Sequence, residues 1–313
     1  MPKPDPCIER TSCQPLRACQ AAAAHVQADM QPSSMSPETS PVEEFLVAFH
    51  DKRPGLTSKA FGSLPVVCRG RKFASSYEVL ADVVPGVPTA IEVLDLACGD
   101  GHLLSLLASR AQRGLALSGI DMSSSELAIA RSRIGNGAAL RQAKAQGLPF
   151  ASSSFDCVLC HLALMLMDNI EQVVGEVRRV LRRGSRFAAI VGAAPPPSFA
   201  LTAYIESLSK RSRLPHLSAV RFGDRRLSNR EGILEVLAPA FHGTLVEDIH
   251  ISQLLTPEQL WHWFLDMYDL YLLSEPDQRL VEQDFLSAVA SGCGPEGTLE
   301  FPQTLRFVCA TAA

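Results

Sequence analysis

The chain has 313 residues, of which 47% are hydrophobic and 20% charged, a balance typical of a globular protein with a sizeable core. Its 29 basic and 33 acidic residues give a net charge of −4. The chain therefore lacks the excess of basic residues that binds a phosphate backbone, and no nucleic-acid partner is expected. No stretch approaches the roughly 18–20 consecutive apolar residues of a membrane span, and no secretory signal pattern begins the chain. We therefore expect a cytoplasmic protein that does not bind membranes.

Cysteine usage argues against disulfides and metal. The nine cysteines are an odd number, and a chain of this length does not need disulfide staples. Cys157 and Cys160 form a CxxC within an apolar run that predicts a strand, where residues three apart point to opposite faces. Because no second CxxC or CxxH accompanies them, we expect no metal site.

The N-terminal part divides into an arm and a helical region. Residues 1–41 are rich in Pro, Ser, Gln and Ala without sustained periodicity, and we expect a disordered arm. A helical pattern begins at Val42 and ends at the DKRPG segment, and a second short helix is predicted at Ser76–Val84. Residues 42–90 are therefore expected to be a helical region that precedes the main domain.

From residue 91, strand patterns alternate with helix patterns. Five strands are predicted, at Ile91–Leu96, Leu115–Ile120, Ala138–Ala143, Phe155–Cys160 and Arg186–Gly192. The helices between them are predicted at His102–Ala111, Ser124–Arg133 and Ile170–Leu181. Such alternation implies parallel strands joined by right-handed crossovers.

Beyond Gly192 the order is less regular. Helices are predicted at Phe199–Arg211, Asn229–Leu237 (with Ser228 as N-cap), Pro257–Leu273 and Pro276–Ala290. Strands are predicted at Thr244–Ser252 and Leu299–Thr311. We expect one domain over 91–313, with lid insertions at about 195–228 and 255–292.

The segment VLDLACGDGHL carries the clearest chemical signal. Asp95 ends a predicted strand, Gly99 and Gly101 follow in the turn, and a helix begins at His102. Glycines let the backbone approach a ligand closely, and the helix N-terminus adds free amides. Ligands of open α/β sheets bind at the carboxyl ends of the strands, where this loop lies.

Three details separate this loop from a dinucleotide site. Leu104 replaces the third glycine of GxGxxG. Asp95 would repel a pyrophosphate but suits a cationic amino-acid ligand. Asp121 ends the next strand, where it can accept hydrogen bonds from both ribose hydroxyls. A dehydrogenase is therefore disfavoured.

These features resemble the class I S-adenosylmethionine-dependent methyltransferases, in particular the small-molecule enzymes of the biotin and ubiquinone pathways (methyltransferase type 11). The matching segments are VLDLACGDG, GIDMS, LPFASSSFDCVLCHLALMLMD and VRRVLRRGSRFAAIV. The resemblance covers about residues 75–195 and extends in element order to 230–312. It implies an α/β fold, a Rossmann-like, seven-stranded, mostly parallel sheet with an antiparallel last strand, helices on both faces and helical lid insertions.

The resemblance also implies the cofactor, S-adenosylmethionine, with S-adenosylhomocysteine as the product. Its binding positions fall on Asp95, Ala97, Cys98, Gly99, Gly101, Asp121 and Met122. The first five would surround the methionine portion, and Asp121 would hold the ribose. Met122 would pack on the adenine, or belong to the ordinary core. Asp95 can also cap the loop amides.

One position departs from the family pattern. Before LPF these enzymes usually carry an Asp-Ala pair whose carboxylate meets the adenine amino group, whereas here the residues are Lys144 and Ala145, followed by Gln146. Lysine cannot accept a hydrogen bond. Either the adenine is held by backbone at Ala145 or by the Gln146 amide, or the alignment shifts by one residue.

Catalysis of this kind requires few dedicated groups, because methyl transfer from a sulfonium is an in-line displacement dominated by positioning and desolvation. A base is needed only if the acceptor loses a proton. The candidates for a catalytic role are His161, which follows the fourth strand, and Tyr77, which lies on a helix of the kind that closes over the cofactor. His161 is also a candidate contact to the cofactor. A loop histidine bonded to backbone is the alternative for His161. Arg71 or Lys72 could meet the methionine carboxylate, or form a solvated turn.

The acceptor is expected beneath the lid. Its candidate residues are His50, Tyr204, His250, Trp263 and Met267. On one continuous helix over 257–273, Trp261, Leu265, Tyr268 and Leu272 share a face, while Trp263, Met267 and Leu270 share another. Such a helix is apolar almost all round, which indicates core packing, a subunit contact or a pocket wall.

The sequence therefore predicts a methyltransferase that modifies a small molecule, a secondary metabolite, at N, O or C, as a monomer or homodimer. A protein or RNA methyltransferase is disfavoured because the chain lacks a basic excess. A non-catalytic protein that binds S-adenosylmethionine is the other alternative, and Lys144 is its only support.

Overall fold

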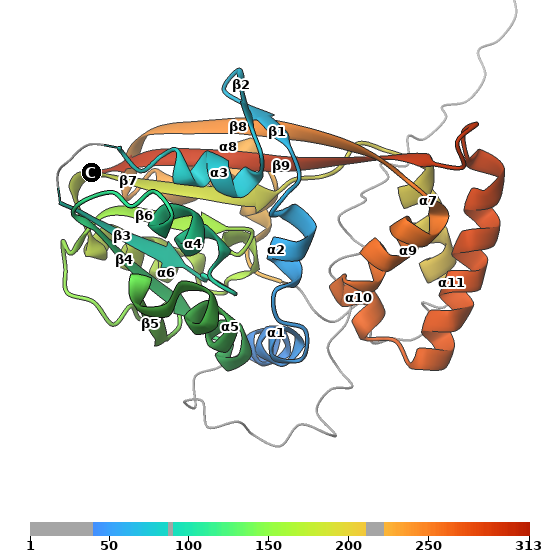
Figure 1. The fold of residues 1–313 in the computed structure, drawn as a ribbon, viewed down its shortest axis with the longest axis horizontal. Helices are drawn as coiled ribbons and strands as arrows, with labels where there is room; N and C mark the ends of the chain where they lie inside the picture. The colour runs from blue at the N-terminus through green and yellow to red at the C-terminus, as the bar shows by residue number, and fades with distance from the viewer. Residues whose placement is uncertain (1–39, 87–89, 211–221) are drawn as a thin grey trace, which may run out of the picture.

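The computed structural model describes residues 40–86, 90–210 and 222–313, so the arm predicted over 1–41 lies almost wholly outside it. A seven-stranded sheet in the order β5-β4-β3-β6-β7-β9-β8 forms its centre (Figure 1). The strands are β3 (Ile91–Leu96), β4 (Leu115–Asp121), β5 (Ala139–Gln142), β6 (Phe155–His161), β7 (Leu181–Gly192), β8 (Phe241–Leu255) and β9 (Leu299–Ala312). Strand β9 alone runs in the direction opposite to the other six strands of this sheet, and this confirms the predicted Rossmann-like fold.

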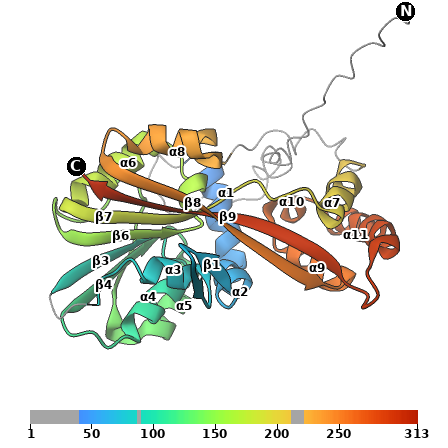
Figure 2. The ribbon, with the colours of Figure 1, turned by 90° about the horizontal axis from the view of Figure 1, so that it is seen from above.

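Helices cover both faces of the sheet (Figure 2). On one face lie α3 (Ser76–Ala81), α4 (His102–Ala108) and α5 (Ser124–Ile134), and on the other lie α6 (Ile170–Val180) and α8 (Arg230–Leu237). Alternate strand residues serve the two cores, and Cys157 and Cys160 accordingly lie on opposite faces, as predicted. In the described part of the chain, no group of histidines, cysteines and acids could hold a metal.

The N-terminal region contains more than the sequence predicts. Helix α1 (Pro41–Lys52) begins with a capping box in which Ser40 and Glu43 satisfy each other's backbone amides. It is followed by a short helix α2 (Leu56–Phe61) and a hairpin of β1 (Val66–Cys68) and β2 (Arg71–Phe73), neither of which was predicted. Their brief patterns give too few residues for periodicity to show.

Beyond one end of the sheet, four helices form what we call the helical unit. They are α7 (Phe199–Ser209), α9 (Pro257–Leu265), α10 (Tyr268–Tyr271) and α11 (Glu275–Val289). The long strands β8 and β9 extend past the other strands to reach this unit (Figures 1 and 2). Its aromatic core includes Phe45 of α1, so α1 lies between the helical unit and the sheet.

Two details of the predicted elements are wrong. The single helix predicted over 257–273 is interrupted, because Met267 takes an extended backbone (φ −89°, ψ 155°) and α10 restarts after it. The two apolar faces drawn along that helix therefore do not run through the break. Asn229, not Ser228, caps α8, since its side chain accepts from the Gly232 amide at 2.8 Å.

The remaining short segments are 3-10 turns, at Gly135–Gly137, Leu164–Leu166, Arg225–Ser228 and Ala290–Gly292. None of the helices in the described ranges is both long and apolar enough to cross a membrane.

Candidate functional site

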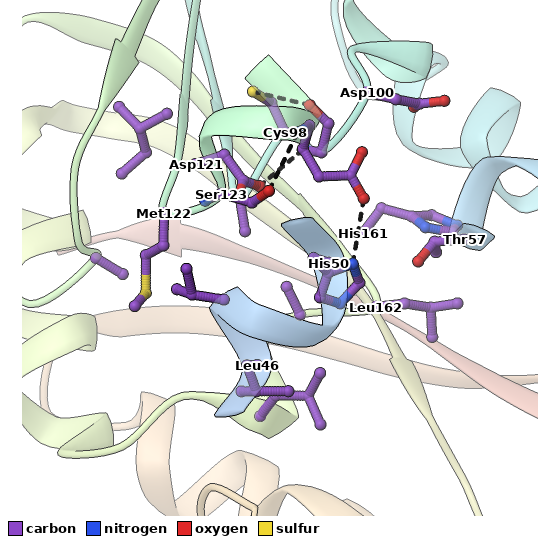
Figure 3. A pocket seen from close by; sticks show the side chains of 18 of the residues that line it. Leu46, His50, Thr57, Cys98, Asp100, Asp121, Met122, Ser123, His161 and Leu162 are labelled. Carbon is purple, nitrogen blue, oxygen red and sulfur yellow. Dashed lines mark hydrogen bonds and ion pairs between the residues drawn. The ribbon is translucent and has the colours of Figure 1, made fainter. Parts of the chain in front are cut away.

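A pocket opens at the carboxyl ends of β3, β4 and β6, where the chain order reverses from one side of β3 to the other. The loops after these strands form its floor, and residues of α1, α2 and α10 close it from above. Figure 3 shows Leu46 and His50 on α1 beside the strand ends that carry Asp121 and Met122.

The loop after β3 is shaped by unusual backbone angles. Ala97, Gly99 and Gly101 all have positive φ, of 58°, 51° and 76°. At Gly101 a Cβ would lie 2.6 Å from the Ile134 side chain and 3.0 Å from that of Ala130, so only glycine fits there. Gly101 is the N-cap of α4 and lets the start of that helix pack closely against α5, whereas Ala97 and Gly99 line the pocket.

Acidic groups dominate this end of the pocket. Asp95 is buried, one of its carboxylate oxygens has no hydrogen-bond partner, and burial together with nearby Asp121 and Asp100 raises its pKa. Asp121 accepts from the amides of Gly99 (2.9 Å) and Ser123 (2.8 Å), and burial raises its pKa in spite of these bonds. A cationic ligand would relieve the cost of keeping these carboxylates ionised.

A second cluster lies beside the acids. The ring of Tyr77 stacks on that of His161 at 3.5 Å between centroids, and the Nε2 atom of His161 lies 2.9 Å from the Ser76 hydroxyl. Burial lowers the pKa of His161 to about 3, so the imidazole is neutral at physiological pH. Burial also raises the pKa of Tyr77, so its phenol stays protonated. Both residues line the pocket. The alternative of a loop histidine bonded to backbone does not hold for the Nε2 atom of His161, because its partner is the Ser76 side chain.

Lys144, the departure from the family pattern, belongs to a network with α1. Its Nζ atom lies 2.6 Å from a carboxylate oxygen of the buried Glu43. The other oxygen of Glu43 accepts from the Gln146 amide at 2.9 Å, and that amide also donates to the Asp168 carbonyl at 2.8 Å. Lys144 therefore faces α1, while Ala145 and Gln146 line the pocket.

A chain of hydrogen bonds crosses the top of the pocket. The Nδ1 atom of His50 lies 3.1 Å from a carboxylate oxygen of Glu126, and its Nε2 atom lies 3.2 Å from the Tyr268 hydroxyl. The other oxygen of Glu126 accepts from the Gly55 amide at 3.0 Å. The buried Glu126 thus joins α5 to the turn after α1, and His50 joins both to α10.

Six predicted site residues lie elsewhere. Gly101 does not line the pocket, because it is the N-cap of α4 and packs against Ala130 and Ile134. Arg71 pairs with Asp82 at 2.6 Å and does not line the pocket. The others, which do not line it either, are Tyr204, His250, Trp263 and Met267. Tyr204 stacks on Phe264 at 4.0 Å in the core of the helical unit, where Trp263 also packs. Tyr204 and Trp263 serve packing because α10, not α7 or α9, meets the pocket, and Met267 packs against the same core. His250 is exposed on β8, with its Nδ1 atom 3.5 Å from the Thr304 hydroxyl.

Several pocket residues were missed by sequence reasoning. They are Glu43, Leu46, Val47, Glu126, Leu162, Leu166, Met167 and Tyr268. Glu43 and Glu126 sit in the first turns of helices, where a glutamate is ordinarily interpreted as a helix-dipole residue. The contact between Glu126 and His50 would mark both as pocket residues, but the sequence does not show that they are paired.

The residues present fit S-adenosylmethionine. The unpartnered oxygen of buried Asp95 suits an ammonium group, and the glycine loop leaves room for close approach of the methionine portion. Asp121 has the acceptor capacity that ribose hydroxyls require, and Met122 and Ala145 offer apolar contact to a purine. The sulfonium charge would also meet a pocket end rich in carboxylates.

Comparisons with known proteins show which family the chain resembles. A family model described as a methyltransferase domain matches residues 94–189. The chain is 30% identical over 169 residues to the demethylmenaquinone methyltransferase of Thermotoga maritima, covering 54% of this chain and 66% of that protein. It is also 30% identical over 186 residues to the ubiquinone/menaquinone biosynthesis C-methyltransferase UbiE of Desulfotalea psychrophila, covering 57% and 74%.

A solved structure shares the fold. Phosphoethanolamine N-methyltransferase 2 of Haemonchus contortus, in complex with S-adenosyl-L-methionine, superposes with a TM-score of 0.52 and 17% identity. The superposition covers 88% of this chain and 61% of that one.

Proposed function

The chain belongs to the class I S-adenosylmethionine-dependent methyltransferases, and from that premise we propose that it methylates a small, largely apolar molecule held between the cofactor loop and α1. The observation that carries the proposal is the pocket itself. The residues that fit S-adenosylmethionine and a set of apolar side chains line the same cavity, so the methyl donor and the acceptor can bind next to each other. The relatives named above carry quinone-pathway methyltransferase names, and a quinol-like ring is one acceptor of the proposed class.

The cofactor end is assigned to Asp95, Ala97, Cys98, Gly99 and Asp121. When bound, S-adenosylmethionine supplies the methyl group, which leaves its sulfur by in-line displacement. Asp95 would bind the ammonium group, and Asp121 the ribose, held in place by the Gly99 and Ser123 amides. Fixed donors and acceptors of this kind cost no reorganisation when the ligand arrives.

The acceptor end is assigned to the apolar part of the lining. Its side chains are Leu46, Val47, Leu162, Leu166, Met167 and Tyr268. Apolar walls exclude water from the nucleophile and fit a flat or branched hydrocarbon skeleton. In this proposal, α10 supplies the contact that closes the pocket through Tyr268, and α7, α9 and α11, which share one hydrophobic core with α10, hold it in place.

His50 is proposed as the base for an acceptor that loses a proton. Glu126 accepts from one ring nitrogen, which fixes the tautomer and leaves the other nitrogen as an acceptor toward the pocket. In the structure that nitrogen meets the Tyr268 hydroxyl. His161, whose pKa is about 3, is a poor base, and we assign it and Tyr77 to shaping the acceptor wall.

A labelling experiment tests the proposal. Purified protein is incubated with [methyl-¹³C]S-adenosylmethionine and a low-molecular-mass metabolite extract, and mass spectrometry identifies what gains the label. Labelled small molecules are expected with the wild type and not with Asp121→Ala. Label found only on protein or RNA in an unfractionated extract would contradict a small-molecule acceptor. Tight cofactor binding without any labelled product in either extract would favour the non-catalytic alternative.

A further inference from the structure

We propose that the side-chain oxygen of Gln146 reads the exocyclic amino group of adenine, and that Glu43 orients it for this purpose. The inference rests on the proposed function in one respect, that an adenosyl ligand occupies this pocket. It concerns the position where the family's usual carboxylate is replaced, and it gives helix α1 a part in recognising the base.

The orientation of the Gln146 amide follows from its partners. Its nitrogen donates to a Glu43 carboxylate oxygen (2.9 Å) and to the Asp168 carbonyl (2.8 Å). Both partners are acceptors only, so a flipped amide would set its oxygen against two oxygens. The amide nitrogen is fully used, and only the oxygen remains to face a ligand.

That oxygen is an acceptor without a donor. It is buried, has no hydrogen-bond partner, and belongs to a residue that lines the pocket. A buried acceptor left unpaired is costly, and a donor group on a ligand would remove the cost. The same wall carries Ala145 and Met122, apolar contacts that suit the faces of a purine.

Glu43 acts as the positioning residue. It is buried, and its second carboxylate oxygen receives Lys144 at 2.6 Å and the Ser40 amide at 3.2 Å. These donors hold the carboxylate in place, so the free oxygen stays directed at the Gln146 amide. Lys144, which cannot accept a hydrogen bond, thus serves base recognition through Glu43 and not by touching the base.

The test compares two ligands that differ at one group. S-Adenosylhomocysteine carries the amino donor, whereas S-inosylhomocysteine carries a carbonyl oxygen that would oppose Gln146. A site that pairs with a donor rejects the analogue lacking it, because its own acceptor then stays unpaired. Isothermal titration calorimetry should give the wild type a preference of about 30-fold for the adenine ligand.

Three variants sharpen the result. Gln146→Leu should reduce the preference to about 3-fold or less. Gln146→Glu should reduce it as well, because its second carboxylate oxygen would oppose the Glu43 carboxylate and the Asp168 carbonyl and the side chain would lose its orientation. Glu43→Gln should reduce it partially, because a neutral amide no longer fixes the orientation. Gln112→Leu, outside the pocket, is the matched control and should behave as the wild type. Circular dichroism and melting temperature confirm folding of each variant.

The outcomes separate this inference from the proposed function. Wild-type binding of both ligands with equal affinity, or an unchanged preference in folded Gln146→Leu, would overturn the role of Gln146 and leave the methyltransferase proposal standing. Absence of any binding of S-adenosylhomocysteine to the wild type would overturn both.

Discussion

The pocket and the helical unit both bury polar atoms without partners, and the contrast between them is instructive. In the pocket, Asp95 and Gln146, each with an unpartnered buried oxygen, are among the residues that line a cavity. In the helical unit, an oxygen of Asp269 is equally unpartnered, but that residue does not line the pocket and lies in a unit with an aromatic core. The first kind of unsatisfied atom indicates a binding partner, whereas the second only lowers stability.

Among substitutions in the pocket, removal of the proposed base His50 should have the largest effect on the rate of methyl transfer. For an acceptor found by labelling, His50→Ala should lower kcat by about 10²- to 10³-fold, because proton removal is lost. The Kd for S-adenosylhomocysteine should change little, and added imidazole should restore part of the rate. His250→Gln on β8, outside the pocket, is the control. A rate that imidazole does not restore would assign His50 to structure alone.

Loss of the ribose acceptor should come next. Asp121→Ala removes the carboxylate that we assign to the ribose hydroxyls, and its amide partners Gly99 and Ser123 lose their acceptor. We expect calorimetry to show about 100-fold weaker binding of S-adenosylhomocysteine. Asp269→Asn should bind normally. Binding of Asp121→Ala within a factor of three of the wild type would contradict the assignment.

Neutralisation of Asp95 should have opposite effects on binding and stability. Its pKa is raised in the folded state, so its ionisation opposes folding as pH rises from the usual carboxyl range through the raised value. Asp95→Asn should therefore raise the melting temperature of the ligand-free protein at pH 7.5 but not at pH 4. The same variant should bind S-adenosylhomocysteine about 10-fold more weakly, because the ammonium group loses its charge partner. A fall in both quantities would show that Asp95 stabilises the loop instead.

A substitution in the helical unit should have the smallest effect on function, because it should change only the stability of the protein. Burial raises the pKa of Asp269 to about 7, so the wild type loses stability as pH rises from about 4 toward 7. Asp269→Asn should increase the free energy of unfolding by about 4 kcal/mol at pH 8 and leave it unchanged near pH 4. Urea denaturation at the two pH values measures this, with kcat and cofactor binding unaltered. Weaker cofactor binding in this variant would remove the distinction between the two regions.

How far the sequence reaches also differs between the two regions. The position of the predicted cofactor loop follows from local patterns, because Asp95 and Asp121 lie at the ends of predicted strands and Gly99 comes directly after one. The helical unit was predicted as helices but with the wrong continuity, since nothing in the apolar run shows that Met267 becomes extended. Periodicity reports which residues are apolar and not which partner covers them.

The top of the pocket could not be predicted, for a reason of distance along the chain. Glu126 is 76 residues from His50, and Tyr268 is 218 residues from it. The sequence alone presents Lys144 as the loss of an adenine-binding carboxylate, whereas in the structure it forms an ion pair with Glu43. Such long-range pairs leave no local pattern, and only the packing of α1 over the strand ends brings them together.

Hydrogen–deuterium exchange with saturating S-adenosylhomocysteine tests the central claim most directly, because it maps the ligand onto one region or the other. Peptides that cover 94–101, 120–126 and 143–147 should exchange more slowly when the ligand is bound, while those of 275–289 should not change. Protection confined to the helical unit, or no protection at the three loops in protein that calorimetry shows to be saturated, would contradict the account.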